Sequence, residues 1–361
     1  MTLKELLFNK DTVSMLANSV FNVYHDFDKA GFINEALLHF PKQELKERMT
    51  TVRVVLEKYL PNDYVEAIEI LTNAFNDFEE SHFIYGSILE YIEYNGLSDE
   101  HLKLSLNKLG DFTKYFSAEF AIRPFFNSYP ESVLTEVLKW AQSDDIHQRR
   151  LASEGVRPSL PWGMNINIDY KDGAKSLEYL YYDTERYVTR SVANHLNDIS
   201  KKDPEFVLKT LKRWKNSHKQ DSIEMEYIIK HSLRTLVKKG HNATLEFLGY
   251  NLNPKIDYSI LELSAKEVNI GGKLHFNFEV FAKEAVTLII DYNVIYPTKH
   301  GKTTKKTYKL KTINVKNNQK IQINGSRSFK PISTRTLYPG VHKIEIQVNG
   351  KIILSDSFTL K

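Results

Sequence analysis

The sequence predicts a multidomain protein: an all-α solenoid of HEAT-like helical repeats over residues 1–255, then a small all-β immunoglobulin-like sandwich over residues 256–361. Three observations predict this division. The spacing of apolar residues changes near Asn253 and Pro254, a repeat of about 40 residues precedes that point, and the charge of the two parts is opposite. A chain of 361 residues is long enough to form both cores.

The first part is predicted to be helical because its apolar residues recur three and four positions apart, as in residues 134–141. Pro130 and Pro204 stand where helices are expected to begin, and Gly155 and Gly240 follow helical segments as C-terminal stops. We therefore expect many short helices in succession.

A weak internal repeat organises these helices. The segments QRRLASEG, VTRSVANH and IIKHSLRT each follow a shorter, aromatic-bearing helix, and their basic residues Arg149, Arg190 and Lys230 are 41 and 40 positions apart. This period is typical of HEAT-type helical pairs, which stack into a curved solenoid with a concave surface.

Apolar and polar residues alternate in the last hundred residues, as in residues 273–280 and 341–348. Alternation with period two is typical of half-buried strands. Turn signals separate about seven such segments, at Gly271-Gly272, 297–301, Asn317-Asn318, Pro339-Gly340 and Asn349-Gly350. A small immunoglobulin-like sandwich accommodates this pattern.

The composition excludes several classes of protein. Without any cysteine, the chain has neither disulfides nor thiolate metal ligands, which favours a cytoplasmic protein. No signal peptide or bilayer-length apolar segment is present, so no membrane association is expected. The twelve histidines are scattered and form no HExxH motif. A metal-dependent hydrolase is therefore not favoured, and neither a metal nor a cofactor is expected.

The two parts differ in charge. Residues 1–255 carry 32 basic and 37 acidic side chains, whereas residues 256–361 carry 17 basic and 8 acidic ones. The basic second part favours a polyanionic partner, although a charged, solvated face is an alternative. Its segment 299–311 holds six lysines, among them Lys302, Lys305 and Lys306. These are candidate DNA contacts, or they protect a sheet edge from pairing.

Polar residues that recur in the repeats are the candidates for chemistry. Three groups lie at helical spacing: Arg150 with Glu154, Glu119 with Arg123, and Arg190 with Asn194 and Asp198. Each can be an ordinary exposed ion pair or polar face. Their repetition in successive repeats instead favours one shared groove, since equivalent helices of a solenoid line the same surface.

The loop after Gly155 contains Arg157, Pro158, Pro161 and Trp162. Two prolines and a tryptophan predict a rigid loop, and Trp162 is either a plug between helices or part of the site. Trp140 and Trp214 lie in apolar helical stripes and are expected to fill the core.

Three segments of the chain, RRLASEGVRPSLPWG, EFAIRPFF and RSVANHLNDISKKDP, resemble the AlkC-type alkylpurine DNA glycosylases of the AlkC/AlkD superfamily. FDKAGF, LKERM and the segment Leu60 to Tyr64 resemble the opening helices of that family. The resemblance covers the helical part, and some members append an immunoglobulin-like domain.

The resemblance implies a solenoid that binds double-stranded DNA and hydrolyses the N-glycosidic bond of cationic bases such as 3-methyladenine and 3-methylcytosine. A cationic base leaves as a neutral molecule, so the enzyme needs anions near the sugar more than a strong general acid. Glu154 is the first candidate, with Glu119 and Asp198 beside it, and Trp162 would face the sugar or the base.

The arginines suit phosphate groups better than chemistry, because guanidinium groups grip phosphate oxygens in pairs. The candidate DNA contacts in the helical part are Arg123, Arg149, Arg150, Arg157, Arg190 and Asn194. We expect a monomer bound to alkylated duplex DNA. The alternative is a HEAT-repeat scaffold without catalytic activity that binds a protein or damaged DNA.

Overall fold

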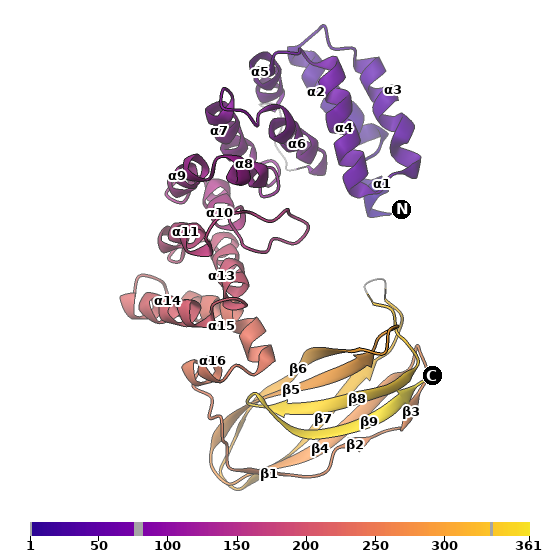
Figure 1. The fold of residues 1–361 in the computed structure, drawn as a ribbon, viewed down its shortest axis with the longest axis vertical. Coiled ribbons are helices and arrows are strands. Elements are labelled where there is room, and N and C mark those ends of the chain that lie inside the picture. Colours follow the sequence, from indigo (N-terminus) through magenta and orange to yellow (C-terminus); the bar gives the residue numbers. More distant parts are fainter. Residues whose placement is uncertain (1, 76–81, 333–334) are drawn as a thin grey trace. The chain divides into compact units, whose positions relative to one another are not determined.

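The computed structural model describes residues 2–75, 82–332 and 335–361. Helices precede strands along the chain (Figure 1), as the sequence predicts. The helices are α1 (Leu3–Leu7), α2 (Lys10–Val23), α3 (Lys29–His39), α4 (Leu45–Tyr59), α5 (Tyr64–Phe75), α6 (Gly86–Asn95), α7 (Leu102–Phe112), α8 (Ile122–Ser128), α9 (Pro130–Trp140), α10 (Ile146–Glu154), α11 (Tyr170–Gly173), α12 (Leu177–Leu180), α13 (Arg186–Ser200), α14 (Pro204–Ser217), α15 (Ser222–Lys239) and α16 (Asn242–Phe247), with short 3₁₀ segments at Phe40–Lys42, Phe83–Tyr85 and Ala174–Ser176.

The chain forms two compact units. The first comprises Met1–Ile199 and Arg213–Ser232, and the second comprises Ser200–Lys212 and Leu233–Lys361. The expected boundary at residues 255 and 256 marks the change from helix to strand, since the first strand begins at Ile256. The second compact unit also includes helical residues that precede this point.

The predicted helix signals have clear structural roles. Pro130 and Pro204 are the first residues of α9 and α14. Gly155 caps α10, and Gly240 follows α15 with a φ of 69°, a left-handed conformation that favours glycine. Trp140 and Trp214 are buried, which confirms that they pack in the core.

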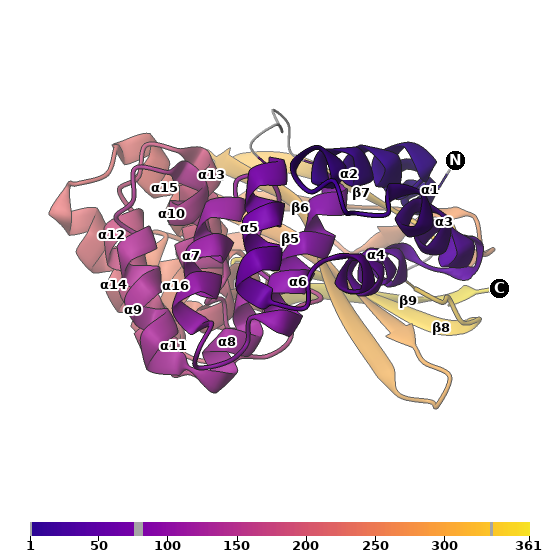
Figure 2. The ribbon, with the colours of Figure 1, turned by 90° about the horizontal axis from the view of Figure 1, so that it is seen from above.

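Helices of the first unit pack in successive pairs. The contacts of α10 with α9, α7 and α12 join neighbouring repeats. The Ser191 hydroxyl of α13 forms a hydrogen bond of 3.0 Å with that of Ser153 of α10, and α10 and α13 are neighbours in both Figure 1 and Figure 2. Equivalent helices of successive repeats, such as α10 and α13, therefore lie side by side and present their side chains to each other.

The β-strands form two sheets. They are β1 (Ile256–Tyr258), β2 (Glu262–Leu263), β3 (Glu267–Val268), β4 (Lys273–Ala282), β5 (Val286–Pro297), β6 (Thr303–Val315), β7 (Gln319–Ser328), β8 (Gly340–Val348) and β9 (Lys351–Leu360). In one sheet β4 pairs with β7 and with both β1 and β2; the other has the order β3-β9-β8-β5-β6. Every pairing is antiparallel except that of β3 with β9.

The core of the sandwich contains the inward-facing apolar side chains of both sheets, including Phe276 and Phe278 of β4 and Ile344 and Ile346 of β8. The alternating burial of β4 matches the pattern read from the sequence. Nine strands are described where about seven were expected, because β2 and β3 have only two residues each and leave no periodic signal.

Candidate active site

The site is built at the carboxyl end of α10. Asp145 caps the first turn by accepting a hydrogen bond from the backbone N–H of His147 at 2.7 Å. Glu154 is the last helical residue, and the chain then leaves the helix at Gly155. A side chain at Gly155 would place its Cβ 3.0 Å from Cγ2 of Ile122. Glycine thus allows α8 to approach the end of α10 closely.

Glu154, Arg157 and Asp198 form a buried ionic network. One Glu154 carboxylate oxygen contacts the Arg157 guanidinium, and Arg157 Nε donates to Asp198 at 2.9 Å. The second oxygen of Glu154 accepts a hydrogen bond of 2.5 Å from the Ser191 hydroxyl. Glu154 is only 5% exposed. Arg157 of the following loop and Ser191 of α13 therefore both fix the carboxylate of Glu154.

A second pair extends this network toward solvent. Arg150 pairs with Glu119 at 2.6 Å and lies 3.8 Å from Glu154, so the ion pair expected from the spacing of Arg150 and Glu154 is present. The Arg150 guanidinium also lies 5.5 Å from the ring centre of Tyr187. We call Glu119, Arg150, Glu154, Arg157 and Asp198 the α10 cluster.

Ionic partners decide the charge state of the buried arginine. Burial alone would lower the pKa of Arg157, but the adjacent Glu154 and Asp198 carboxylates outweigh burial and raise this pKa. Arg157 thus stays positively charged between two carboxylates. The α10 cluster combines three carboxylates with two arginines and can present negative charge at a fixed position.

Trp162 lies at the surface of the loop between α10 and α11. Its indole is 84% exposed, and its backbone has a φ of 64°, which is uncommon for a large side chain. The Trp162 carbonyl accepts a hydrogen bond of 3.1 Å from Lys46 Nζ. The loop backbone is thus held by α4 while the indole faces solvent, so Trp162 is not a plug between helices.

Arg123 has a different role from the one expected. It is completely buried, and its guanidinium donates to the carbonyls of Gly155 and Arg157 and contacts that of Met164. A buried guanidinium whose N–H groups are used in this way cannot grip phosphate, so its prediction as a DNA contact is wrong. The expected pair with Glu119 is also absent from the described ion pairs, because Glu119 pairs with Arg150.

Arg157 is likewise held inside the protein, where it is 7% exposed. Its ion pairs to Glu154 and Asp198 contradict a role in gripping phosphate groups. Its position in the sequence shows that Arg157 follows the end of α10, but not whether its side chain is buried or exposed.

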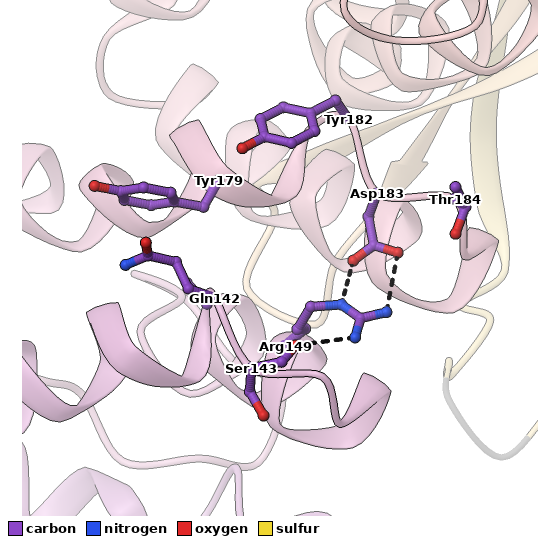
Figure 3. Close-up of a pocket in the computed structure, with 8 residues that line it drawn as sticks. Gln142, Ser143, Arg149, Tyr179, Tyr182, Asp183 and Thr184 are labelled. Carbon is purple, nitrogen blue, oxygen red and sulfur yellow. Dashed lines mark hydrogen bonds and ion pairs between the residues drawn. The ribbon is translucent and has the colours of Figure 1, made fainter.

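Arg149 lines a surface hollow of about 490 Å³ beside α10 (Figure 3). Its Nε donates to Asp183 at 2.6 Å, and its NH1 donates to the carbonyls of Ser143 and Asp144. Tyr179 and Tyr182 lie on the opposite side of this hollow. Arg149 therefore ties two neighbouring repeats together, and its role as a DNA contact stays a prediction.

Arg190, Asn194 and Asp198 do not share one environment. Arg190 is exposed, Asn194 Oδ1 accepts a 2.9 Å hydrogen bond from His231 Nε2, and Asp198 is buried against Arg157. Each four-residue step on a helix rotates by about 40°, so positions eight residues apart diverge by about 80°. The row that faces α10 is Ser191, His195 and Asp198.

Ser191 and His195 were not predicted as site residues, although both lie in the segment RSVANHLNDISKKDP. His195 is fully buried, and its Nδ1 lies 3.0 Å from the carbonyl oxygen of Ser153. The available signal was their spacing of seven and three residues from Asp198, which places all three on one helical face.

Lys302, Lys305 and Lys306 are exposed, in the hairpin of the second unit.

The described residues, 2–75, 82–332 and 335–361, contain neither a candidate metal site nor a helix able to span a membrane. No group of three or more histidine, aspartate or glutamate side chains is arranged to hold a metal ion among these residues. Within the same ranges no helix combines the length and the apolar character needed to cross a bilayer.

Comparison with known proteins identifies the family. Residues 42–231 match the sequence model of a family described as DNA alkylation repair enzyme, and residues 257–361 match the C-terminal immunoglobulin-like domain of the protein YhaZ. The chain is 35% identical over 355 residues to YhaZ of Bacillus subtilis, with 97% of each chain covered. The chain belongs to the DNA alkylation repair enzyme family.

A solved member of the AlkC type has the same fold throughout. Pseudomonas fluorescens alkylpurine DNA glycosylase AlkC, bound to DNA containing an abasic site analog, matches with a TM-score of 0.92 and 30% identity, and 100% of each chain is covered. The predicted resemblance and the predicted order of helical repeats and immunoglobulin-like sandwich are thereby confirmed.

Proposed function

We propose that the protein is a DNA glycosylase that removes cationic alkylated bases, such as 3-methyladenine and 3-methylcytosine, from double-stranded DNA. It would act as a monomer in the cytoplasm, without a metal or cofactor. The observation that carries the proposal is the α10 cluster, in which Glu154 is fixed by Arg157 and Ser191. Family membership and the likeness to AlkC support it.

The reaction follows from the chemistry of a charged leaving group. The C1′–N bond breaks with its electron pair moving to the base, which leaves neutral, while positive charge develops on the deoxyribose. The carboxylates of Glu154, Glu119 and Asp198 stabilise this charge. Water then bonds to C1′, and its proton passes to a carboxylate and on to solvent. Trp162 would offer its exposed ring to the sugar or the cationic base.

DNA binding is assigned to the exposed cationic groups. Arg190 of the first unit and Lys302, Lys305 and Lys306 of the second are exposed and suit phosphate groups. Asn194 is proposed as a polar neighbour of Arg190. Arg149 and Arg150 already hold carboxylates, so we assign them at most a shared contact with the DNA backbone.

The deciding experiment is base release from methylated duplex DNA by wild type and Glu154→Gln. The variant keeps the shape of the side chain but loses its charge, so we expect release to fall by about 100-fold or more, with affinity for abasic duplex retained. Glu131→Gln is the matched control, because Glu131 is exposed on α9. Absence of release by wild type would favour a non-catalytic scaffold.

The DNA contacts are tested by the salt dependence of binding. Changing Lys302, Lys305 and Lys306 together to alanine should weaken binding and flatten the slope of log K against log salt by about 1 per lost phosphate contact. Lys351→Ala, Lys361→Ala and Lys343→Ala combined remove the same charge elsewhere in the second unit. An equal effect of both sets would show that net charge, and no particular contact, governs binding.

A further inference from the structure

Buried side chains satisfy the backbone at the end of α10. The Ser176 hydroxyl donates to the carbonyl of Ala152 at 2.9 Å, and Arg123 donates to that of Gly155 at the same distance. His195 Nδ1 lies 3.0 Å from the carbonyl oxygen between these two, that of Ser153. The last carbonyls of a helix lack helical partners, and leaving them buried without one is costly.

The protonation of His195 follows from this contact. A carbonyl oxygen can only accept, so Nδ1 carries the proton and donates. Burial lowers the pKa of His195 to about 4, so the ring is neutral at neutral pH with a bare Nε2. The imidazole is therefore a fixed hydrogen-bond donor and not a proton carrier for the reaction.

His195 lies on α13 between Ser191, which contacts the α10 cluster, and Asp198, which belongs to it. Ser191, one turn earlier on α13, donates to Glu154, and Asp198, one turn later, accepts from Arg157. His195 binds the peptide oxygen immediately before Glu154. One face of α13 thus contacts the Glu154 side chain, the Arg157 guanidinium that pairs with it, and the peptide group that precedes it.

We propose that His195 is a positioning residue for Glu154, which fixes the Ser153–Glu154 peptide so that the carboxylate is correctly placed before DNA binds. His195 touches neither DNA nor water in the reaction. The inference rests on the proposed glycosylase function and adds a determinant of its rate. Displacement of a reacting group by about 1 Å can cost about 100-fold in rate.

The test compares His195→Leu, which removes the donor, with His195→Asn, whose amide nitrogen can take the place of Nδ1. We expect His195→Leu to lower the single-turnover rate of base release by at least about 10-fold, with unchanged affinity for abasic duplex. His195→Asn should recover most of the rate. The control is Ser176→Ala, which removes the neighbouring bond to Ala152 and should lower the melting temperature but not the rate.

Three outcomes would overturn the inference: a wild-type rate in His195→Leu, no recovery in His195→Asn, or an equal loss of rate in Ser176→Ala. If His195→Leu does not fold, His195→Gln replaces it, because its amide nitrogen lies nearer the position of Nε2 and should not restore the rate. Nitrogen NMR of wild type must also find the Nδ1–H tautomer at neutral pH. Absence of base release by wild type contradicts the glycosylase assignment instead, whatever the tautomer.

Discussion

Two groups of partly or fully buried carboxylates in the first unit differ in how their charge is balanced. The α10 cluster sets three carboxylates against Arg150 and Arg157. The α6 cluster, which we define as Arg53, Glu57, Glu90 and Glu93, sets three carboxylates against one arginine, and that arginine pairs with Glu57 at 2.8 Å.

The difference appears in the pKa values of two carboxylates of the α6 cluster, Glu90 and Glu93. Burial, followed by repulsion from Glu90, raises the pKa of Glu93 to about 7. Burial also raises the pKa of Glu90, although Thr50 donates to it. Burial of carboxylates beside few cationic groups therefore raises their pKa values. A site that must offer negative charge to a sugar cation needs the arginines that the α10 cluster supplies.

The largest expected effect comes from removing the charge of Arg157. Arg157→Met leaves Glu154 and Asp198 buried without their shared partner, so the free energy of unfolding should fall by about 3–5 kcal/mol. Urea unfolding measures this loss. Arg53→Met is the matched control in the α6 cluster and should cost less, because Glu57 is more accessible. Equal losses would remove the distinction between the two clusters.

The sequence predicted those features of the α10 cluster that depend on neighbouring residues in the chain, but not its buried contacts between repeats. The spacing of Arg150 and Glu154 correctly indicated an ion pair, and the prolines and glycines correctly marked helix ends. These features depend on neighbours along the chain, which the sequence displays directly.

The buried roles of Arg123 and Arg157 depend on other repeats, which spacing does not reveal. Arg123 reaches carbonyls more than thirty residues away, and Arg157 reaches Asp198 from a loop without periodicity. The same limitation hid Ser191 and His195, because the choice between two adjacent faces of α13 depends on where α10 lies. Contacts between repeats, and not residue type, separate structural arginines from those available to DNA.

The second expected effect is on the pH dependence of stability. Glu93 has a folded pKa of about 7 against an ordinary value of 4.5, so the folded state keeps a proton that the unfolded state loses between these values. Its contribution to stability therefore falls as pH rises from 4.5 to 7. Glu93→Gln should remove this decline and raise the free energy of unfolding at pH 8 by about 1–2 kcal/mol after allowance for solvent screening.

Thermal and urea unfolding of Glu93→Gln at pH 4 and pH 8 provide the measurement. The two proteins should differ little in stability at pH 4, where Glu93 is protonated in the folded state and mostly protonated in the unfolded state. Glu131→Gln is the control, since Glu131 is exposed. Parallel pH profiles of wild type and Glu93→Gln would mean that Glu93 is ionised in the folded protein and that the α6 cluster holds no excess proton.

The smallest effect is expected where carboxylate and cation are both in solvent. Lys209 and Glu205 pair at 2.8 Å on α14, with 76% and 77% of their side chains exposed. Water and salt already screen both charges, so Lys209→Ala should leave the melting temperature unchanged within error at pH 7 and at high salt. A clear loss would show that ion pairing stabilises this chain even without burial. The contrast between the two clusters would then reflect the number of arginines alone, and not the low-dielectric surroundings of Glu154 and Asp198.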